Sequence, residues 1–206
     1  MVSRIRFGLL AVSLALLVVM VGNGNAQVLL NEVLADPASD WDGDGAHNSR
    51  DDEWVEIVNV GIEAVDLTNY HLAGADGALR YGFSGSLAPG AVRVVYGSES
   101  YNWEVATGNP AFGLRLANGG GAITLVVLAA DTTQVDCYEY LDHEADDDRS
   151  SGRVPDGGTW QLFDALNVYD GTEAPLGSGC VPTPGATVSC PTAVEPKTWG
   201  GVKKGG

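Results

Sequence analysis

The chain is short of positive charge. It has 11 Lys and Arg against 27 Asp and Glu, which gives a net charge of −16 at pH 7. A surface of this sign repels phosphate backbones, and the sequence contains no basic stripe that would overcome the repulsion. The composition therefore argues against nucleic acid as a partner. It leaves three explanations of the negative charge open, namely binding of metal cations, binding of cationic polymers and simple solubility outside the cell.

Helical repeats and catalytic groupings are also scarce. After Gln27 no segment has a convincing helical period, whereas short runs rich in Val, Ile and aromatic residues alternate with turns that draw on 28 Gly. The three His do not lie near any nucleophile motif, so a hydrolytic triad has no support. These features predict an all-β protein that is not an enzyme.

A long apolar run occurs at the N-terminus. Arg4 and Arg6 precede the apolar stretch Phe7–Val21, and Gly24–Ala26 supplies the small residues of a cleavage site. The fifteen residues of this stretch fall short of the roughly 20 that a membrane-spanning helix needs. We therefore expect residues 1–26 to be a signal peptide, so that the mature chain, with a net charge of about −18, is secreted or held at the cell surface without a membrane span.

Cysteine is rare, and its three residues differ in their surroundings. Cys180 and Cys190 lie close together in a proline-rich stretch, so an exported chain is expected to join them in a disulfide. Cys137 lies in a strand pattern and is expected to be a buried small hydrophobe. We expect one folded domain over residues 27–166, followed by a flexible Pro/Gly-rich linker or tail over residues 167–206.

Short strands account for most of the predicted domain. The expected strands are Val28–Leu34, Glu53–Val60, Val65–Leu72, Leu79–Phe83, Val92–Tyr96, Leu114–Leu116, Ala122–Leu128 and Gln134–Tyr140. In the second of these, Trp54–Val58 alternates as a half-buried strand does, and Gly97–Pro110 is expected to be irregular. Successive strands joined by Gly, Asp and Pro turns predict an antiparallel β-sandwich.

The acidic stretch before the second strand has the spacing of a calcium loop. In a twelve-residue window that begins at Asp40, the oxygen ligands at positions 1, 3, 5, 9 and 12 are Asp40, Asp42, Asp44, Asn48 and Asp51. Gly45 occupies the sixth position, where such a loop turns sharply, and the Ala46 carbonyl is the backbone ligand. The sequence thus predicts Ca²⁺ as a possible cofactor.

Two features of this loop depart from the usual calcium motif. Asp51 replaces the longer Glu of the twelfth position, which would limit the affinity to a Kd of roughly 10⁻⁴–10⁻³ M. The flanking helices are missing, because Asp36-Pro37 precedes the loop and a strand follows it. The alternative is a solvated acidic loop without a metal.

Other groupings are weaker candidates for a site. His143 with Glu144 and Asp146–Asp148 is a second acidic cluster, for which a charged loop is the more common interpretation than a metal site. Glu32 and Glu56, in adjacent predicted strands, are either an acid pair with one raised pKa or solvent-facing residues. An aromatic platform for sugars would use Trp54, Tyr70, Tyr81, Trp103 and Trp160, although aromatic residues more often cover a sandwich core.

Several segments, taken in order, resemble the lamin tail domain in its bacterial secreted form. They are Leu30–Pro37, Asp52–Asn59, Val65–Leu67, Tyr70–Leu72, Leu87–Gly90 and Ser151–Gly157. The resemblance runs from Leu30 to about Ala165, with Tyr70 where the family often has Trp. It implies an immunoglobulin-like β-sandwich without catalytic residues.

The expected function is a non-catalytic extracellular or cell-surface interaction or structural module, stabilised by calcium if the acidic loop binds it. Its partner would be an unknown protein or a surface polymer. The alternatives are a metal-dependent hydrolase that uses the two acidic loops and a carbohydrate-binding module.

Overall fold

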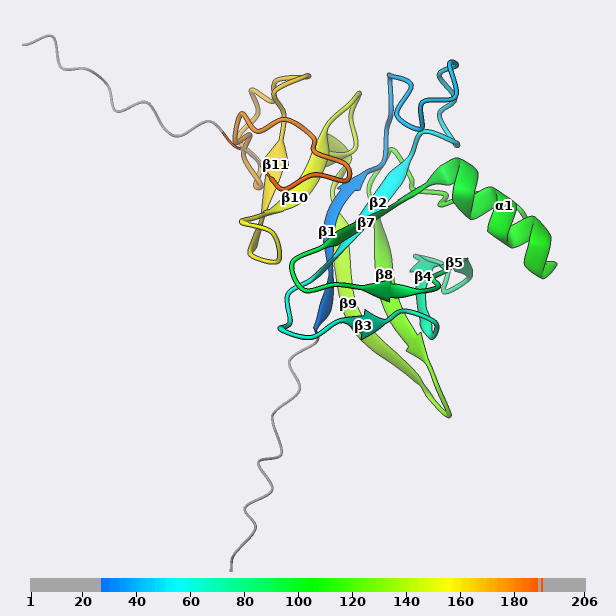
Figure 1. Ribbon diagram of the computed structural model, residues 1–206. Helices are drawn as coiled ribbons and strands as arrows, with labels where there is room; N and C mark the ends of the chain where they lie inside the picture. Colours follow the sequence, from blue (N-terminus) through cyan, green and yellow to red (C-terminus); the bar gives the residue numbers. More distant parts are fainter. Residues whose placement is uncertain (1–26, 189, 191–206) are drawn as a thin grey trace, which may run out of the picture.

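Two antiparallel sheets lie face to face in the computed structural model, which describes residues 27–188 and 190 (Figure 1). The first sheet, in the order β11-β10-β1-β2-β7, consists of Thr159–Phe163, Ser150–Val154, Val28–Leu34, Trp54–Asn59 and Val92–Tyr96. The second, in the order β5-β4-β8-β9, consists of Leu79–Gly82, Tyr70–Gly74, Gly121–Leu128 and Thr132–Tyr140. A small pair, β3 (Val65–Asp66) and β6 (Ser86–Leu87), completes the strands.

The hydrophobic core fills the space between the two sheets. Val55 and Ile57 of β2 pack in one cluster with Leu72 of β4 and with Ile123 and Leu125 of β8, and all five are fully buried. Because strand side chains alternate between faces, β2 and β8 each give alternate residues to this cluster. The architecture confirms the predicted immunoglobulin-like all-β sandwich.

Strand β2 differs from its prediction in one respect, because all six of its residues are buried. The outward-facing Trp54 packs against Trp41 and Tyr96 rather than against solvent. Glu56, on the same outer face, is also fully buried. The alternating pattern wrongly predicted an exposed outer face for β2, because segments outside the sheets cover that face.

A helix replaces the expected irregular stretch. Helix α1 spans Gly97–Thr107 and ends at Gly108, whose φ of 74° allows the left-handed cap. Its buried residues are Gly97, Ser100 and Glu104, so the inward face is helical in spacing but polar in chemistry. A search for apolar periodicity therefore could not detect it.

The predicted strand at Leu114–Leu116 is wrong as well. Leu114 and Leu116 are buried in the core, but Arg115 between them has a φ of 55°, which a strand does not allow. The amide of Leu116 donates instead to the buried Glu53 carboxylate, at 3.2 Å. The apolar alternation came from two core side chains on an irregular segment.

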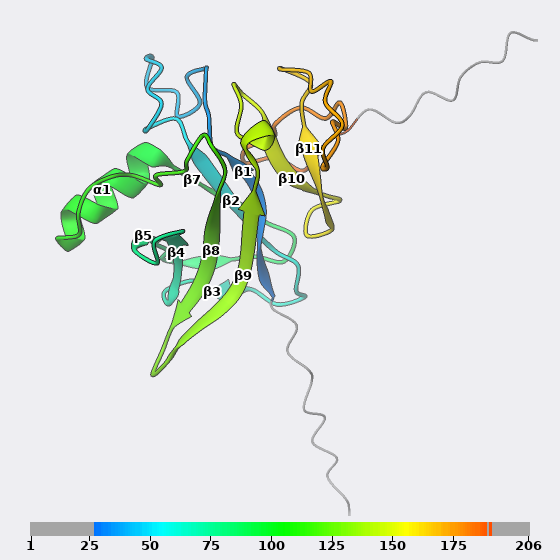
Figure 2. The ribbon, with the colours of Figure 1, turned by 180° about the vertical axis from the view of Figure 1, so that it is seen from behind.

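Seen from behind, the β8–β9 hairpin extends beyond the body of the sandwich at the end opposite the long loops (Figure 2). Among the residues that the structure describes, no helix is long and apolar enough to cross a bilayer. The predicted signal peptide, residues 1–26, lies outside the described residues.

Candidate functional site

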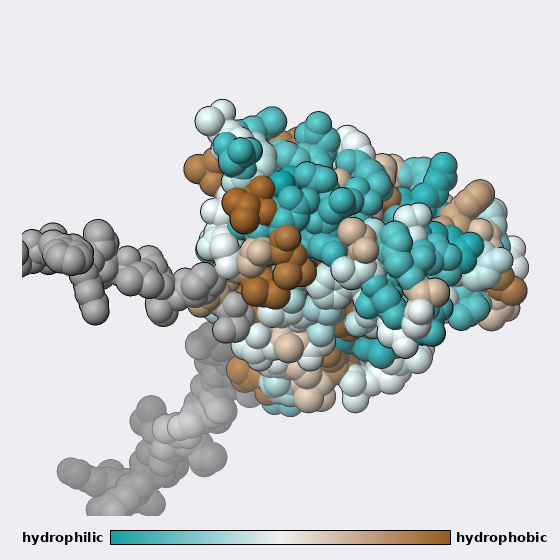
Figure 3. All heavy atoms as spheres, turned by 90° about the horizontal axis from the view of Figure 1, so that it is seen from above, coloured by the Kyte–Doolittle hydropathy of each residue, from teal (hydrophilic) through white to brown (hydrophobic). Residues whose placement is uncertain are grey.

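The loops at one end of the sandwich contain the predicted site. The acidic loop connects β1 to β2, and the second acidic loop connects β9 to β10 through the short 3₁₀ helix η1 (Asp142–Glu144) (Figure 1). Viewed from this end, the surface is mostly hydrophilic, with small hydrophobic patches among the polar residues (Figure 3).

Successive turns shape the acidic loop. The Asp40 carboxylate accepts hydrogen bonds from the amides of Gly43 and Gly45, at 2.8 and 2.9 Å. Asp42 and Asp44 each accept from the amide two residues ahead, at 3.0 and 2.8 Å. Gly45 has a φ of 96°, so the sharp turn predicted at this position is present.

The structure brings only part of the predicted ligand set together. Carboxylate oxygens of Asp40, Asp42 and Asp52 lie within 4.8 Å of one another. Asp51 instead pairs with Arg50 at 2.6 Å, and the Asn48 side chain accepts from the Arg50 amide at 3.1 Å. Asp44 and the Ala46 carbonyl are not part of the cluster of three carboxylates. The calcium site therefore stays a prediction, with Asp52 added next to Asp40 and Asp42.

Asp52 is the residue that sequence reasoning missed. It is fully buried, and its carboxylate accepts from the amides of Trp41, Asp42 and Asn48 at 2.6, 3.0 and 2.7 Å. These three bonds hold both ends of the loop around one carboxylate. The only sequence signal was a further Asp next to position 12 of the calcium motif.

Asp148 of the second acidic loop fastens the start of the first. Its carboxylate accepts from the amide and hydroxyl of Ser39, from the Ala38 amide at 2.8 Å and from the Trp41 indole at 2.7 Å. Burial acts to raise the pKa of Asp148, but the hydrogen bonds from Ser39, Ala38 and Trp41 outweigh it and place the pKa below its usual value.

The two acidic loops also approach each other at Asp36. Its carboxylate lies within 4.8 Å of those of Asp146 and Asp147. Burial, followed by the charges of Asp147 and Asp146, raises the pKa of Asp36. His143 does not join this cluster, because its ring stacks on Tyr169.

Glu32 and Glu56 are opposite each other in the β1–β2 ladder, on the outer face of the first sheet. Both are fully buried, so they are not solvent-facing. The segment that covers them, residues 177–188, is here called the strap. Thr183 donates to Glu32 from its amide, at 3.1 Å, and from its hydroxyl, at 2.9 Å, while the Gly185 amide donates to Glu56 at 2.7 Å.

Burial raises the pKa of both carboxyls, which makes them weaker acids than usual. It raises the pKa of Glu32 to about 7, although hydrogen bonds from Ser150 and Thr183 act in the opposite direction. It raises the pKa of Glu56 to about 7 as well, against the donors Asn31 and Gly185. The expected acid pair is therefore present, but with both pKa values raised and with the strap over it.

The strap differs from the flexible linker that composition predicts from residue 167. The predicted disulfide between Cys180 and Cys190 is confirmed, and Cys180 is fully buried. The Ser178 amide donates to the Leu162 carbonyl on β11 at 3.0 Å, and the Val188 amide donates to Asp156 at 3.3 Å. Few apolar side chains of the strap are buried, and the buried carboxylates that accept hydrogen bonds from its amides help to hold it in place.

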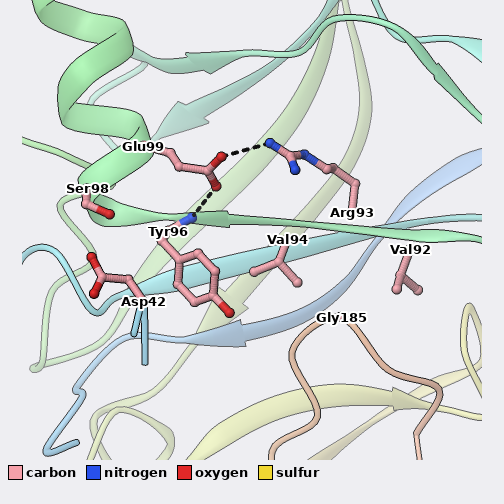
Figure 4. Close-up of a pocket in the computed structure, with 8 residues that line it drawn as sticks. All are labelled: Asp42, Val92, Arg93, Val94, Tyr96, Ser98, Glu99 and Gly185. Atoms are coloured by element: carbon pink, nitrogen blue, oxygen red, sulfur yellow. Dashed lines mark hydrogen bonds and ion pairs between the residues drawn. The ribbon is translucent and has the colours of Figure 1, made fainter. Parts of the chain in front are cut away.

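A groove of about 500 Å³ runs between the strap, β7 and the acidic loop (Figure 4). Val94 and Tyr96 of β7 point toward Gly185, and Asp42 stands at one end. Glu99 pairs with Arg93 at 2.8 Å on the other side of the strand.

The candidate aromatic platform is dispersed. Trp54 is fully buried, and Trp160 stacks on Tyr138 with ring centroids 3.7 Å apart. Tyr81 and Trp103 are inclined to each other by 48°. The five aromatic residues do not form one flat row.

The free Cys137 is only half-buried, unlike the buried residue expected there.

The comparisons with known proteins match the fold. The family model described as Lamin Tail Domain matches residues 22–142, which includes the acidic loop and both sheets up to η1 but not β10, β11 or the strap. No match was found among curated proteins. The immunoglobulin-like domain of this family is typically a non-catalytic module. Since the match covers more than half of the sequence, the chain belongs to the lamin tail domain family.

Proposed function

We propose that this chain is an exported, non-catalytic interaction module whose acidic loop binds Ca²⁺ and is stabilised by it. The observation that carries the proposal is the convergence of Asp40, Asp42 and Asp52 within 4.8 Å at the exposed loop end. Oxygen ligands on a loop suit a hard cation, which would also relieve the repulsion among three carboxylates.

Binding of calcium would tie the loop to the sandwich. Asp52 is anchored beside β2 and holds the amides of Trp41 and Asn48, whereas Asp40 and Asp42 lie toward solvent. An ion shared by the three would therefore fix the exposed turns to a buried carboxylate. The loop end would then present one rigid acidic surface to a protein or a surface polymer.

Thermal unfolding with calcium and with chelator tests this proposal. A ligand at 100 times its Kd should add about 2.7 kcal/mol, which is several degrees in Tm for a domain of this size. Asp42→Ala should abolish the response, while Asp131→Ala, on the exposed β8–β9 turn, should keep it. An unchanged Tm at about 100 mM calcium, which is 100 times a Kd of about 10⁻³ M, would end the calcium proposal.

Export is tested separately. Arg4, Arg6 and the apolar run Phe7–Val21 support a signal peptide, and the Cys180–Cys190 disulfide suits an oxidising compartment. Mass spectrometry of protein recovered from an exporting host should find Gln27 as the first residue. A product that keeps residues 1–26 inside the cell would refute export.

A metal-dependent hydrolase is the second candidate, and the approach of Asp36, Asp146 and Asp147 is the observation in its favour. A panel of ester and phosphoester substrates with Mn²⁺ or Zn²⁺ would test it. Turnover that disappears in Asp146→Ala would support an enzyme, and the absence of turnover on every substrate would favour the interaction module.

A further inference from the structure

His143 lies in a site that the acidic-loop proposal does not use. Its side chain is only 9% exposed, and its ring stacks on Tyr169 with centroids 4.5 Å apart and planes 25° apart. It comes from η1, whereas Tyr169 belongs to the segment after β11. The site therefore joins two parts of the chain that are distant in sequence.

The hydrogen bonds of the ring define its tautomer. Nε2 lies 3.1 Å from the Pro175 carbonyl oxygen, which can only accept, so Nε2 carries the hydrogen. The neutral ring then has a lone pair on Nδ1. Histidines that bind metals commonly have this second interaction, in which the other ring nitrogen donates to a carbonyl or carboxylate.

Nδ1 is buried and has no hydrogen-bond partner. Among the described residues, the other buried side-chain nitrogen or oxygen atoms without a partner are Trp54 Nε1, Arg80 Nε and Tyr140 Oη. Each of those three carries a hydrogen, whereas Nδ1 of the neutral ring offers only a lone pair. The partner of such an atom must be a cation or a hydrogen-bond donor.

Two carboxylates face the same point. Ligand atoms of Asp142, His143 and Glu173 lie within 4.8 Å of one another, and Glu173 Oε2 is 4.0 Å from Nδ1. Two bonds of about 2.0–2.2 Å from zinc reach at most about 4.4 Å, so they would span the 4.0 Å between Nδ1 and Oε2, and a small movement of the exposed Glu173 side chain would bring the ligand atoms closer together. We propose that Asp142, His143 and Glu173 bind a divalent transition-metal ion of the Zn²⁺ type, with water completing its coordination.

The surroundings hold the ligands in place. The Tyr169 hydroxyl accepts from the Glu173 amide at 3.1 Å, so the ring that stacks on His143 also positions the chain of Glu173. A Cβ at Gly171 would collide with the Tyr169 ring, so the turn between them needs glycine. Arg149, nearly buried, donates to the His143 carbonyl at 3.0 Å. The backbone around each ligand is thus fixed by contacts that do not involve the metal.

The donor set separates this site from the calcium loop. One imidazole nitrogen with two carboxylates favours zinc and its neighbours, whereas the oxygen-only loop favours calcium. The ion would act as a clip between η1 and the segment that leads into the strap, because Glu173 precedes the strap by only a few residues.

Zinc titration by calorimetry of protein made from the full-length chain, with excess calcium present, tests the proposal. One zinc should bind per chain. Loss of a partner of a ligand typically weakens metal binding 10–100-fold, so His143→Gln, which removes a ligand itself, should weaken zinc binding at least about 100-fold. His71→Gln is the matched control, since that ring bonds to the Asn69 carbonyl outside the cluster, and it should bind zinc normally.

A second variant and a second readout keep the test decisive if His143→Gln folds poorly. Glu173 has a 65% exposed side chain, so Glu173→Gln should fold normally and still lose at least about tenfold in zinc affinity. The nitrogen NMR shift of Nδ1 should report a metal-bound nitrogen. If both variants bind zinc as tightly as the unsubstituted protein, or if Nδ1 keeps a proton in the presence of zinc, the proposal is overturned.

Discussion

The acidic loop and the strap both lie outside the two sheets, yet they are held in opposite ways. The exposed carboxylates of the acidic loop accept hydrogen bonds from the loop's own amides, so that Asp40 and Asp44 organise the turn in which they stand. The strap brings the amides and one hydroxyl, and the sheet supplies the acceptors Glu32 and Glu56.

The difference teaches where each segment's order comes from. The loop's turns are local, whereas the strap depends on carboxylates about 130 to 150 positions away in sequence. Buried carboxylates without donors would be costly, so the sheet and the strap stabilise each other. A segment of low hydrophobicity can therefore be part of a fold when the fold leaves buried acceptors for it.

Raising the pH should have the largest effect, and more than half of it should act on the strap side. Burial raises the pKa of Glu32 and Glu56 to about 7, and that of Glu53 to about 8, from the usual value of 4.5. The folded state then holds protons that the unfolded state has lost, so this stability is complete below about pH 4.5 and disappears as the pH rises through 7–8.

At about 1.4 kcal/mol per pKa unit, the loss between about pH 5 and about pH 8.5 should be on the order of 9 kcal/mol, of which Glu32 and Glu56 together account for about 5. Urea unfolding at the two pH values measures it. Glu32→Gln combined with Glu56→Gln should remove about half of this pH dependence, and Glu53 should account for the rest. Stability that increased toward pH 8.5 would contradict the buried carboxyls as its source.

Replacing Asp52 should be the next largest change and acts within the acidic loop. Asp52→Ala removes one buried acceptor from the amides of Trp41, Asp42 and Asn48, and hydrogen bonds to a charged group contribute about 1.5–3 kcal/mol each. Three bonds of this kind should give a loss of about 4–5 kcal/mol in denaturant unfolding, at the low end of their sum because they are only partly buried. The neighbouring Asp51→Ala, which breaks only a partly exposed ion pair with Arg50, should cost less than about 1 kcal/mol.

Removing the Cys180–Cys190 disulfide tests how much this bond contributes to holding the strap in place. Cys180→Ser with Cys190→Ser opens a loop with a sequence separation of 10, which should cost about 2–3 kcal/mol of unfolding free energy. Hydrogen exchange should show the Thr183 and Gly185 amides losing protection before β2 does. Unchanged protection of both amides would mean that the carboxylates alone hold the strap.

The smallest effect is expected at Asp44. Its side chain is exposed and bonds only within the loop, so Asp44→Ala without calcium should change the unfolding free energy by less than about 0.5 kcal/mol. The same substitution measured with calcium shows whether Asp44 is a ligand, because the calcium-dependent gain in Tm would then decrease. An equal gain in both proteins would leave Asp40, Asp42 and Asp52 as the carboxylate ligands.

Strand alternation and family motifs were sufficient to predict most of the sandwich. Val28–Leu34 was predicted with its bounds, and the core residues Val55 and Ile57 follow from period-two alternation. Helix α1 was not predicted because its inward residues Ser100 and Glu104 are polar. The docked structure of the C-terminal segment was not predicted because it depends on hydrogen-bond acceptors from β1 and β2.

The candidate site was predicted in part for the same reason. Spacing along the chain identified Asp40 and Asp42, which the structure brings together, but it could not show that Asp51 pairs with Arg50 or that Asp52 lies beside Asp40 and Asp42. His143 was noted as part of an acidic cluster, yet its proposed companion Glu173 lies thirty residues later in a segment expected to be a linker. Local spacing predicts ligands within a loop but not those supplied by a distant segment.

The position of β1 in the first sheet has a consequence for the order in which the chain can fold. β1 is the first strand of the domain, yet it lies between β2 and β10 in the sheet. Its Glu32 accepts a hydrogen bond from Thr183, which is 151 residues further along the chain. Contacts of such separation form slowly, because the chain between them must first be closed into a loop. A chain that is synthesised from its N-terminus therefore cannot complete the first sheet until β11 is available, and it cannot cover Glu32 until the strap follows.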